Sequence, residues 1–236
     1  MKPIFKHFKE FIEHPEPVDF HIHTTFTDGS STIEEYVNRA IQLEIQEIAF
    51  TEHVRRTSTW YLSFVENVES VRESYKNKIH IYHGIETKVV DFNGEVDATD
   101  EMLDTAEIIL GSVHRFPDYF INNLRNNDNP DPKDLAEIEF KLSTGLLKNP
   151  MVDILAHPGG MFIKKCHKKF PRNYLKDLID LANNYNKVIE INSSYLKNVA
   201  FDKDLFSQLN PYVSLGSDAH DEEELGTIVK FIKNTC

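Results

Sequence analysis

The chain alternates short apolar runs with longer amphipathic segments. Seven apolar runs have the length of β-strands and are too short for buried helices. Between them lie segments of helical character, so that strand and helix succeed each other throughout. This succession, together with a length near that of a typical barrel, predicts an α/β protein whose parallel strands form a barrel. The predicted strands are 18–23, 47–51, 79–85, 108–113, 152–156, 188–191 and 213–215, and the predicted helices are 31–43, 60–76, 99–106, 132–147, 172–184, 202–209 and 222–234.

Several boundaries of these elements carry their own signals. Thr32 precedes Glu35 in the arrangement of a capping box, and Asp131 followed by Pro132 places proline at a first helical position. Residues 1–17 have apolar side chains at helical spacing and then two prolines. We therefore expect an extra amino-terminal helix that packs on the barrel and ends before the first strand.

Length and composition limit the classes of function. The 236 residues are near the size of a typical barrel, and the polar stretch 122–132 predicts a surface loop, so we expect one domain over 1–236. The net charge of -12 disfavours nucleic acid as the main partner, although cations on one rim could still attract an anionic substrate. Cys166 and Cys236 suggest neither a disulfide framework nor a thiolate metal site. No segment suits a signal peptide or a membrane span, which predicts a cytoplasmic protein without membrane association.

Potential metal ligands gather where the predicted strands end. His21 and His23 are two residues apart, so they share one face of a strand and can bind one ion together. A closed parallel barrel collects its strand ends on one rim, where barrel enzymes have their active sites. Imidazole and carboxylate ligands without cysteine suit zinc, manganese, iron or cobalt, and their number implies more than one ion. The residues of this pattern are His21, His23, Glu52, His53, Glu86, His114, His157, Asp218 and His220.

Six motifs resemble, in their order, those of the PHP (polymerase and histidinol phosphatase) family. The resemblance spans residues 19–220, and it implies a distorted (β/α)7 barrel similar to a TIM barrel. It also implies three divalent metal ions, such as zinc, manganese or iron, at the carboxyl-terminal rim of the strands. The motifs are His21-x-His23, Thr51-Glu52-His53, Gly84-Ile85-Glu86, Ser112-Val113-His114, Ala156-His157-Pro158 and Ser217-Asp218-Ala219-His220.

The resemblance implies nine ligands for the three ions, with Glu86 bridging two of them. Asp28 lies where family members carry His or Asp, although a Thr-Asp-Gly sequence is ordinarily a turn. Glu52 is expected to orient a ligand rather than bind metal. The implied sets are His21, His23, Glu86 and Asp218 for the first ion, Glu86, His114 and His157 for the second, and Asp28, His53 and His220 for the third.

Clustered divalent ions favour hydrolysis of phosphate esters, because they lower the pKa of a bound water and neutralise the oxygens of an in-line displacement. Arginine offers a bidentate fork for the phosphate oxygens, and Arg115 follows directly after a predicted ligand. The basic run of residues 164–172 is either a solvated face or a cover for an anionic ligand. The predicted catalytic residues are Asp218, His220 and Arg115, and the predicted substrate-binding residues are Arg115, Arg55, Arg56 and Asn192.

Three functions are compatible with this pattern. The favoured one is a phosphatase that acts on a small phosphorylated metabolite, similar to a histidinol phosphatase. The second is an exonuclease or phosphodiesterase that acts on nucleic acid ends, and the chain lacks the basic stripe that backbone tracking ordinarily needs. The third is a non-catalytic metal-binding protein, which the nearly complete set of ligands disfavours. The physiological substrate and the oligomeric state do not follow from the sequence.

Overall fold

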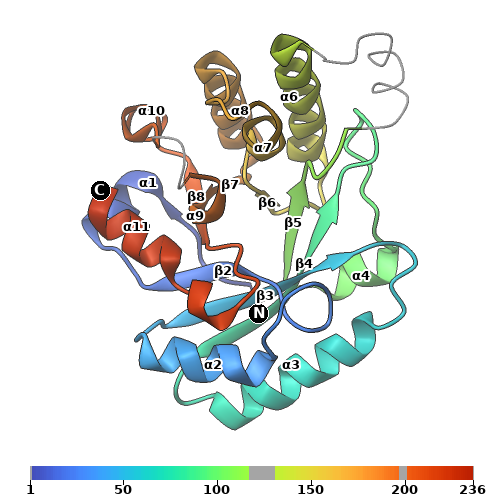
Figure 1. Ribbon diagram of the computed structural model, residues 1–236, viewed down its shortest axis with the longest axis vertical. Helices are drawn as coiled ribbons and strands as arrows, with labels where there is room; N and C mark the ends of the chain where they lie inside the picture. The colour runs from blue at the N-terminus through green and yellow to red at the C-terminus, as the bar shows by residue number, and fades with distance from the viewer. Residues whose placement is uncertain (1, 117–130, 197–200, 236) are drawn as a thin grey trace.

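A computed structural model describes residues 2–116, 131–196 and 201–235. Its strands form one sheet in the order β1-β8-β7-β6-β5-β4-β3-β2 (Figure 1). Adjacent strands from β2 to β8 run parallel, and β1 pairs with β8 in the antiparallel sense. The strands are β1 Lys6–His7, β2 Val18–Ile22, β3 Glu47–Val54, β4 His80–Lys88, β5 Ile108–Ser112, β6 Ile154–Leu155, β7 Val188–Asn192 and β8 Tyr212–Gly216.

Helices surround the sheet on several sides. Figure 1 shows α2, α3 and α4 together beside β3 and β4, whereas α6, α7 and α8 form a second group at the other end. The described part of the chain holds no helix that is long and apolar enough to span a bilayer. The helices are α1 Phe8–Glu13, α2 Ile33–Gln42, α3 Tyr61–Tyr75, α4 Asp100–Thr105, α6 Pro132–Lys148, α7 Gly160–Cys166, α8 Arg172–Tyr185, α9 Ser193–Leu196, α10 Lys203–Leu209 and α11 Thr227–Thr235, with a 3-10 helix η1 at Glu222–Glu224.

The barrel is closed between β2 and the segment that follows β8. Ile22 and Ala219 form a parallel bridge, and the backbone N–H of His23 donates to the Ala219 carbonyl oxygen at 2.9 Å. The buried carboxylate of Asp19 accepts hydrogen bonds from the backbone N–H groups of Ser217 at 2.9 Å and Gly226 at 3.0 Å. The seven parallel strands thus form a distorted (β/α)7 barrel, as predicted.

The predicted elements differ from the observed ones mainly at their ends. β3 and β4 are longer than predicted, so His53 and Glu86 lie inside strands rather than beyond them. The amino-terminal helix is only one and a half turns long, because residues 6–7 pair with β8 as a strand. The predicted helix 222–234 is divided into η1 and α11 at Gly226, whose φ is +71°. The helices α7 and α9 were not predicted.

Two helix starts follow the predicted capping chemistry. The Thr32 side chain accepts from the Glu35 backbone N–H, and the Glu35 carboxylate accepts from the Thr32 backbone N–H at 2.7 Å. Asp131 caps α6, with Pro132 at the first helical position. The predicted surface loop at 122–132 lies, up to residue 130, outside the described residues.

Candidate metal centre

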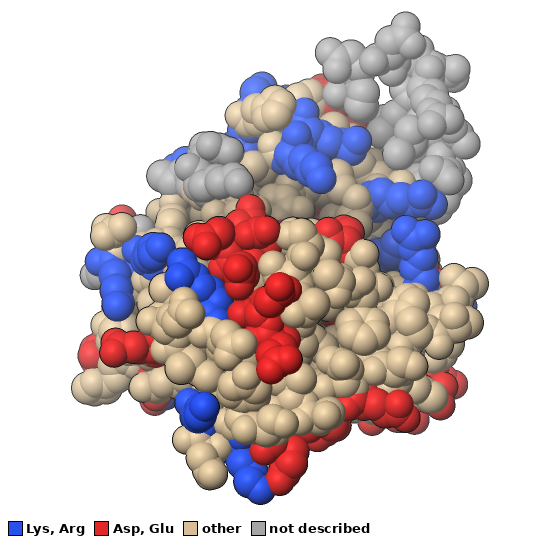
Figure 2. Space-filling model, turned by 60° about the horizontal axis from the view of Figure 1, so that its bottom comes forward, with Lys and Arg blue, Asp and Glu red and all other residues tan. Residues whose placement is uncertain are grey.

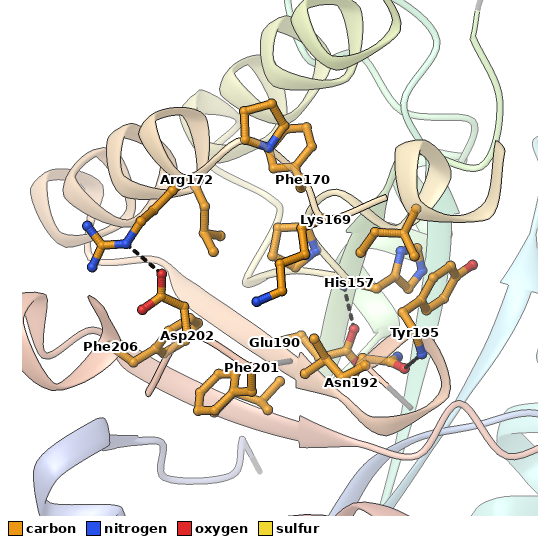
Figure 3. Close-up of a pocket in the computed structure, with 16 residues that line it drawn as sticks. His157, Lys169, Phe170, Arg172, Glu190, Asn192, Tyr195, Phe201, Asp202 and Phe206 are labelled. Atoms are coloured by element: carbon orange, nitrogen blue, oxygen red, sulfur yellow. Dashed lines mark hydrogen bonds and ion pairs between the residues drawn. The ribbon is translucent and has the colours of Figure 1, made fainter. Parts of the chain in front are cut away.

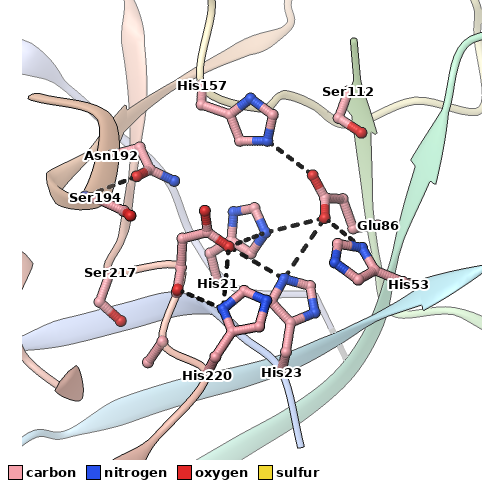
Figure 4. Close-up of polar contacts among 12 residues, drawn as sticks. His21, His23, His53, Glu86, Ser112, His157, Asn192, Ser194, Ser217 and His220 are labelled. Carbon is pink, nitrogen blue, oxygen red and sulfur yellow. Dashed lines mark hydrogen bonds and ion pairs between the residues drawn. The ribbon is translucent and has the colours of Figure 1, made fainter. Parts of the chain in front are cut away.

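The strands bring the predicted ligands to one end of the barrel. In the ladder between β3 and β4, His53 lies directly opposite Glu86. His21 and His23 point to the same side of their strand, and the centroids of their rings are 5.0 Å apart. Figure 4 shows the Glu86 side chain amid imidazole rings that come from four different segments.

Glu86 is the centre of this arrangement. It is 2% exposed, and both of its carboxylate oxygens face imidazole nitrogens. The family resemblance implies that Glu86 bridges the first and second ions, and a position between several imidazole rings suits that role. Oε1 lies 2.8 Å from His114 Nε2 and 2.8 Å from His157 Nε2, and Oε2 lies 2.8 Å from His53 Nδ1, 3.4 Å from His21 Nε2 and 3.5 Å from His23 Nε2.

Asp218 completes the group around His21 and His23. Its Oδ1 atom lies 3.6 Å from His21 Nε2 and 3.3 Å from His23 Nε2. Asp218 adopts a φ of +56°, in the left-handed region, and His157 at the end of β6 has a φ of +29°. Non-glycine residues adopt positive φ rarely, and such residues cluster at functional sites. The backbone thus turns unusually at two of the predicted ligands.

Asp28 joins the cluster from the loop between β2 and α2. Its Oδ2 atom lies 3.5 Å from His53 Nε2, and its Oδ1 atom lies 3.5 Å from His220 Nε2. His53 therefore has one ring nitrogen near Glu86 and the other near Asp28. A residue that is ordinarily a turn former thus lies where the resemblance implies a ligand of the third ion.

Glu52 holds the loop that carries Asp28. Its buried carboxylate accepts from the Thr24 backbone N–H at 2.8 Å, from Thr24 Oγ1 at 2.6 Å and from Thr27 Oγ1. Burial raises the pKa of Glu52 to about 7, although these hydrogen bonds oppose the shift. The loop is tight at Gly29, where a Cβ atom would lie 2.1 Å from the His23 carbonyl oxygen. Glu52 thus acts on the loop and not on a ligand ring directly.

The predicted ligand atoms fit divalent cations. His21 Nε2 and His23 Nε2 are buried and have no hydrogen-bond partner, although both lie close to Glu86 Oε2. Buried polar atoms without partners are rare and call for an explanation. A shared cation would satisfy them, and imidazole and carboxylate groups are suitable zinc ligands. Ligand atoms within 4.8 Å of one another occur in three groups, namely His21, His23 and Glu86; His53, Glu86 and His114; and His23, Asp28, His53 and His220.

The electrostatics of the cluster also favour a positive charge. Burial alone would lower the pKa of His21, but the carboxylates of Glu190, Glu86 and Asp218 outweigh it and hold that pKa well above its usual value. Burial raises the pKa of Glu86, but His114 and His21 bring it well below the usual range. The lowered pKa keeps the Glu86 carboxylate ionised, and its negative charge would stabilise a cation among the rings.

Glu190 is a component of the site that was not predicted. Its Oε1 atom lies 2.6 Å from His21 Nδ1, and its Oε2 atom accepts from the His157 backbone N–H at 2.6 Å. Carboxylates that bind the second nitrogen of a histidine ligand orient its ring. Gly216 leaves room for this contact, because a Cβ there would lie 2.0 Å from Glu190 Oε1. The available signal was the spacing of Glu190 and Asn192 by two residues on an otherwise apolar strand.

A cavity of about 720 Å³ opens over the cluster. Among the described residues that line it, Lys164 is the one lysine or arginine, and His167 and Tyr195 lie in the wall as well. From the sequence, Lys164 belongs either to a solvated face or to a cover for an anion, and no role is predicted for His167. Lys164 lies on α7 and His167 directly follows it, and this helix was not predicted.

The three predicted arginines are not among the described residues that line this cavity. Arg55 and Arg115 are exposed. Arg56 is bound to the turn after β4, with Nη2 2.5 Å from Glu95 Oε1 and 3.2 Å from the Val96 carbonyl oxygen. Asn192 is not among the described residues that line this cavity either, and it is 2% exposed at the end of β7. Its Oδ1 atom accepts from the Ser194 backbone N–H at 3.0 Å, and its Nδ2 atom has no partner (Figure 4).

Comparison with protein families agrees with the resemblance of the motifs. Residues 19–194 match the PHP domain, and the chain belongs to this family. A probable phosphatase of Thermoanaerobacter sp. (strain X514) is 27% identical over 230 residues, which cover 92% of this chain and 85% of the relative. A probable phosphatase of Proteus mirabilis (strain HI4320) is 24% identical over 230 residues, with coverage of 92% and 84%.

Solved structures share the fold at low sequence identity. The histidinol phosphate phosphatase of Lactococcus lactis, crystallised with zinc, L-histidinol and phosphate, is 18% identical. Its TM-score is 0.66, and the match covers 91% of this chain and 93% of that one. A putative histidinol phosphatase of Listeria monocytogenes has a TM-score of 0.72 at 16% identity, with coverage of 93% and 100%. At this level of identity the likeness concerns the fold.

Proposed function

We propose that this chain is a metal-dependent phosphoesterase that hydrolyses a small phosphate monoester at a site for three divalent ions. The observation that carries the proposal is the convergence of five imidazole rings on the buried Glu86 carboxylate, where His21 Nε2 and His23 Nε2 have no hydrogen-bond partner. Membership of the PHP family and the naming of the curated relatives as probable phosphatases support the reaction class.

In this proposal the three ligand sets that the family resemblance implies hold one ion each, and these sets overlap with the three observed groups of neighbouring ligand atoms without being identical to them. Bound divalent ions would supply a water of lowered pKa and neutralise charge on the phosphate oxygens. Zinc, manganese and iron all suit the ligand set. The zinc in the structure from Lactococcus lactis makes zinc the first ion to test. The ligands of the proposed ions are His21, His23, Glu86 and Asp218; Glu86, His114 and His157; and Asp28, His53 and His220.

The chain's own residues would bind and orient the phosphate. Lys164 lines the cavity from α7, so it is the cation that we propose for the non-bridging oxygens, in the role that the sequence suggested for Arg115. Asn192 has a buried Nδ2 atom free to donate, and its carbonyl oxygen is held by α9. Fixed donors of this kind act without reorganisation when charge develops on the substrate.

The charge around the site favours a small substrate over nucleic acid. Glu224 lines the cavity, and it belongs to η1, which consists of Glu222, Glu223 and Glu224. Figure 2 shows acidic side chains gathered in the middle of one face of the molecule. Because binding of a nucleic acid backbone depends on many cationic contacts, acidic residues at the mouth oppose it. A small phosphate ester needs only the few cations within the cavity.

The first test is elemental analysis of the purified protein, together with release of phosphate from an aryl phosphate. We expect three ions per chain, loss of phosphate release after chelation and recovery after zinc or manganese is added. A short DNA or RNA oligonucleotide is the parallel substrate. Release of nucleotides without hydrolysis of any monoester would favour the exonuclease. Bound metal without hydrolysis of either substrate would favour a non-catalytic metal-binding protein.

A further inference from the structure

A second cavity, of about 410 Å³, adjoins the metal centre (Figure 3). Its volume lies in the range of pockets that hold small molecules. It is bounded by the loop before α8, by the first turn of α8, by β7 and by α10. Aromatic and aliphatic side chains form most of its wall, including Phe170, Leu175, Ile191, Phe201 and Phe206.

The two cavities share a wall. Ile163 and Tyr195 line both of them. His157 also lines the second cavity, and its Nε2 atom lies 2.8 Å from Glu86 Oε1 in the metal cluster. The ring of Tyr195 stacks on that of His157 at a centroid distance of 4.6 Å. One end of the apolar cavity is therefore formed by a predicted metal ligand and by the aromatic ring that covers it.

Glycines at the start of α7 maintain this shape. A Cβ at Gly160 would lie 2.9 Å from Tyr195 Cε1 and 3.0 Å from His157 Nδ1, so a larger residue would disturb the stacked rings. Gly159 has a φ of +81°, and a Cβ there would lie 2.5 Å from Phe170. Phe170 can lie this close to Gly159, and Tyr195 this close to Gly160, because neither glycine has a side chain.

Polar groups occur at both ends of the cavity. At the metal end, Asn192 is buried and has an Nδ2 atom without a partner. At the far end, Arg172 Nε donates to Asp202 Oδ2 at 2.7 Å. In the view of Figure 3 the amino group of Lys169 lies between these ends. An apolar wall with a few polar groups is the usual composition of a ligand pocket.

We propose that the second cavity binds the alcohol part of the substrate and selects monoesters whose alcohol has an apolar body of at least one aromatic ring. This inference rests on the proposed function, because it requires the phosphate to lie at the metal centre. The occupant follows from the adjacency of the two cavities, which have Ile163 and Tyr195 in their common wall. The phosphate would face Lys164, and the apolar body would lie against Phe170 and Phe201.

Benzyl phosphate and ethyl phosphate test the proposal, because both are esters of primary alcohols and differ mainly in their apolar body. Burial of an aromatic ring predicts kcat/KM at least about 10-fold higher for benzyl phosphate. Equal kcat/KM for the two esters would overturn the inference and leave the phosphatase function intact. Hydrolysis of neither ester, with cleavage of an oligonucleotide, would overturn the proposed function and this inference with it.

Two matched variants on α8 locate the effect. Leu175 and Leu181 are both half-buried and pack against the core, and only Leu175 lines the cavity. Leu175→Trp fills the cavity, so we expect it to lower kcat/KM for benzyl phosphate at least about 10 times more than for ethyl phosphate. Leu181→Trp should leave the ratio as in the wild type. If Leu175→Trp folds and leaves the ratio of kcat/KM for benzyl phosphate to that for ethyl phosphate unchanged, the proposal is contradicted. If this variant does not fold, the comparison of the two esters in the wild-type protein still tests the proposal.

Discussion

The first half of the barrel, from β2 to β4, and the second half, from β5 to β8, position their functional residues differently. In the first half, β3 has eight residues and β4 has nine, and their ladder pairs His53 with Glu86. In the second half, β6 has two residues, and His157 follows it with a positive φ. Regular pairing therefore places His53 and Glu86 in the first half, where Asp28 lies on a loop, whereas a turn places His157 in the second.

The two halves of the barrel also contribute different parts of the site. The first half contributes the central carboxylate and the paired histidines, which are buried and close together. The second half contributes α7 and α9, which bring Lys164 and Tyr195 to the cavity. The difference suggests that the metal cluster depends on the strands and that substrate recognition depends on the helices of the second half.

Removal of one ligand from each half should have the largest effect. His53→Ala removes a ligand that a strand holds, and Asp218→Asn removes a negative charge while keeping a residue that tolerates positive φ. Loss of a residue that only hydrogen-bonds to a metal ligand typically lowers activity about 10- to 100-fold. We expect each of these two substitutions to lower turnover by more than that. Turnover and metal content of the folded variants measure this. Full activity in either variant would contradict the proposed cluster.

Glu190→Gln tests the contact that joins the halves, since Glu190 binds His21 on β2 and the backbone of His157 after β6. The amide retains the size of the side chain and loses the charge. We expect metal affinity or turnover to fall about 10- to 100-fold. Titration of the metal-free protein with zinc gives the affinity. An unchanged affinity and rate would mean that His21 is oriented without Glu190.

Lys164→Ala tests whether substrate charge is recognised from the second half. Because the variant loses a charged hydrogen bond, we expect its KM for a phosphate monoester to rise at least about 10-fold. Lys165→Ala is the control, because Lys165 is the next residue on α7 and is not among the described residues of the cavity wall. Steady-state kinetics of both variants, with Arg55→Ala and Arg115→Ala alongside, separate the alternatives. If the arginine variants raise KM and Lys164→Ala does not, the sequence-based prediction is right.

The smallest expected effect is that of substituting Glu139, which should change how the free energy of unfolding depends on pH. It lies on α6, and its carboxylate accepts from the backbone N–H groups of Met161 at 3.1 Å and Phe162 at 2.6 Å, at the start of α7. Burial raises the pKa of Glu139 to about 8, although these hydrogen bonds oppose the shift. Because the folded state binds this proton more tightly than the unfolded chain, the stabilisation is complete below the ordinary pKa and is lost as the pH rises toward 8.

The free energy of unfolding, measured with urea at several pH values, should therefore decrease between about pH 4.5 and pH 8. Glu139→Gln should flatten this decrease, by on the order of 1 kcal/mol or more. Glu137→Gln is the matched control, since Glu137 lies exposed on the same helix and is paired with Lys141 at 2.6 Å. A decrease of equal size in wild type and Glu139→Gln would assign the pH dependence to other groups.

The parts of the site that lie on strands could be predicted from the sequence. A spacing of two residues identified His21 and His23, and the order of the motifs identified Glu86 and Asp218 as implied ligands. The structure brings all of the implied ligands to one end of the barrel. The strands themselves were found because a buried strand is apolar over a short, contiguous run.

The substrate side of the site could not be predicted in the same way. Rim arginines were inferred from their position beside ligands in the sequence, yet Arg56 is bound to Glu95. α7 begins at Gly160, after a glycine in a left-handed conformation and without a side-chain cap, so its start has no local signal. The backbone N–H groups at that start are instead bound by Glu139, more than 20 residues earlier in the chain.

The sequence by itself thus determined the alternation of strands and helices, the family and the ligand motifs, because these depend on neighbouring residues. The tertiary structure alone decided that Glu190 contacts His21, that Lys164 lines the cavity over the ligand cluster and that an apolar cavity adjoins it. Each of these contacts joins segments far apart in the chain. Their existence depends on packing and on non-local hydrogen bonds, which leave no periodic pattern in the sequence.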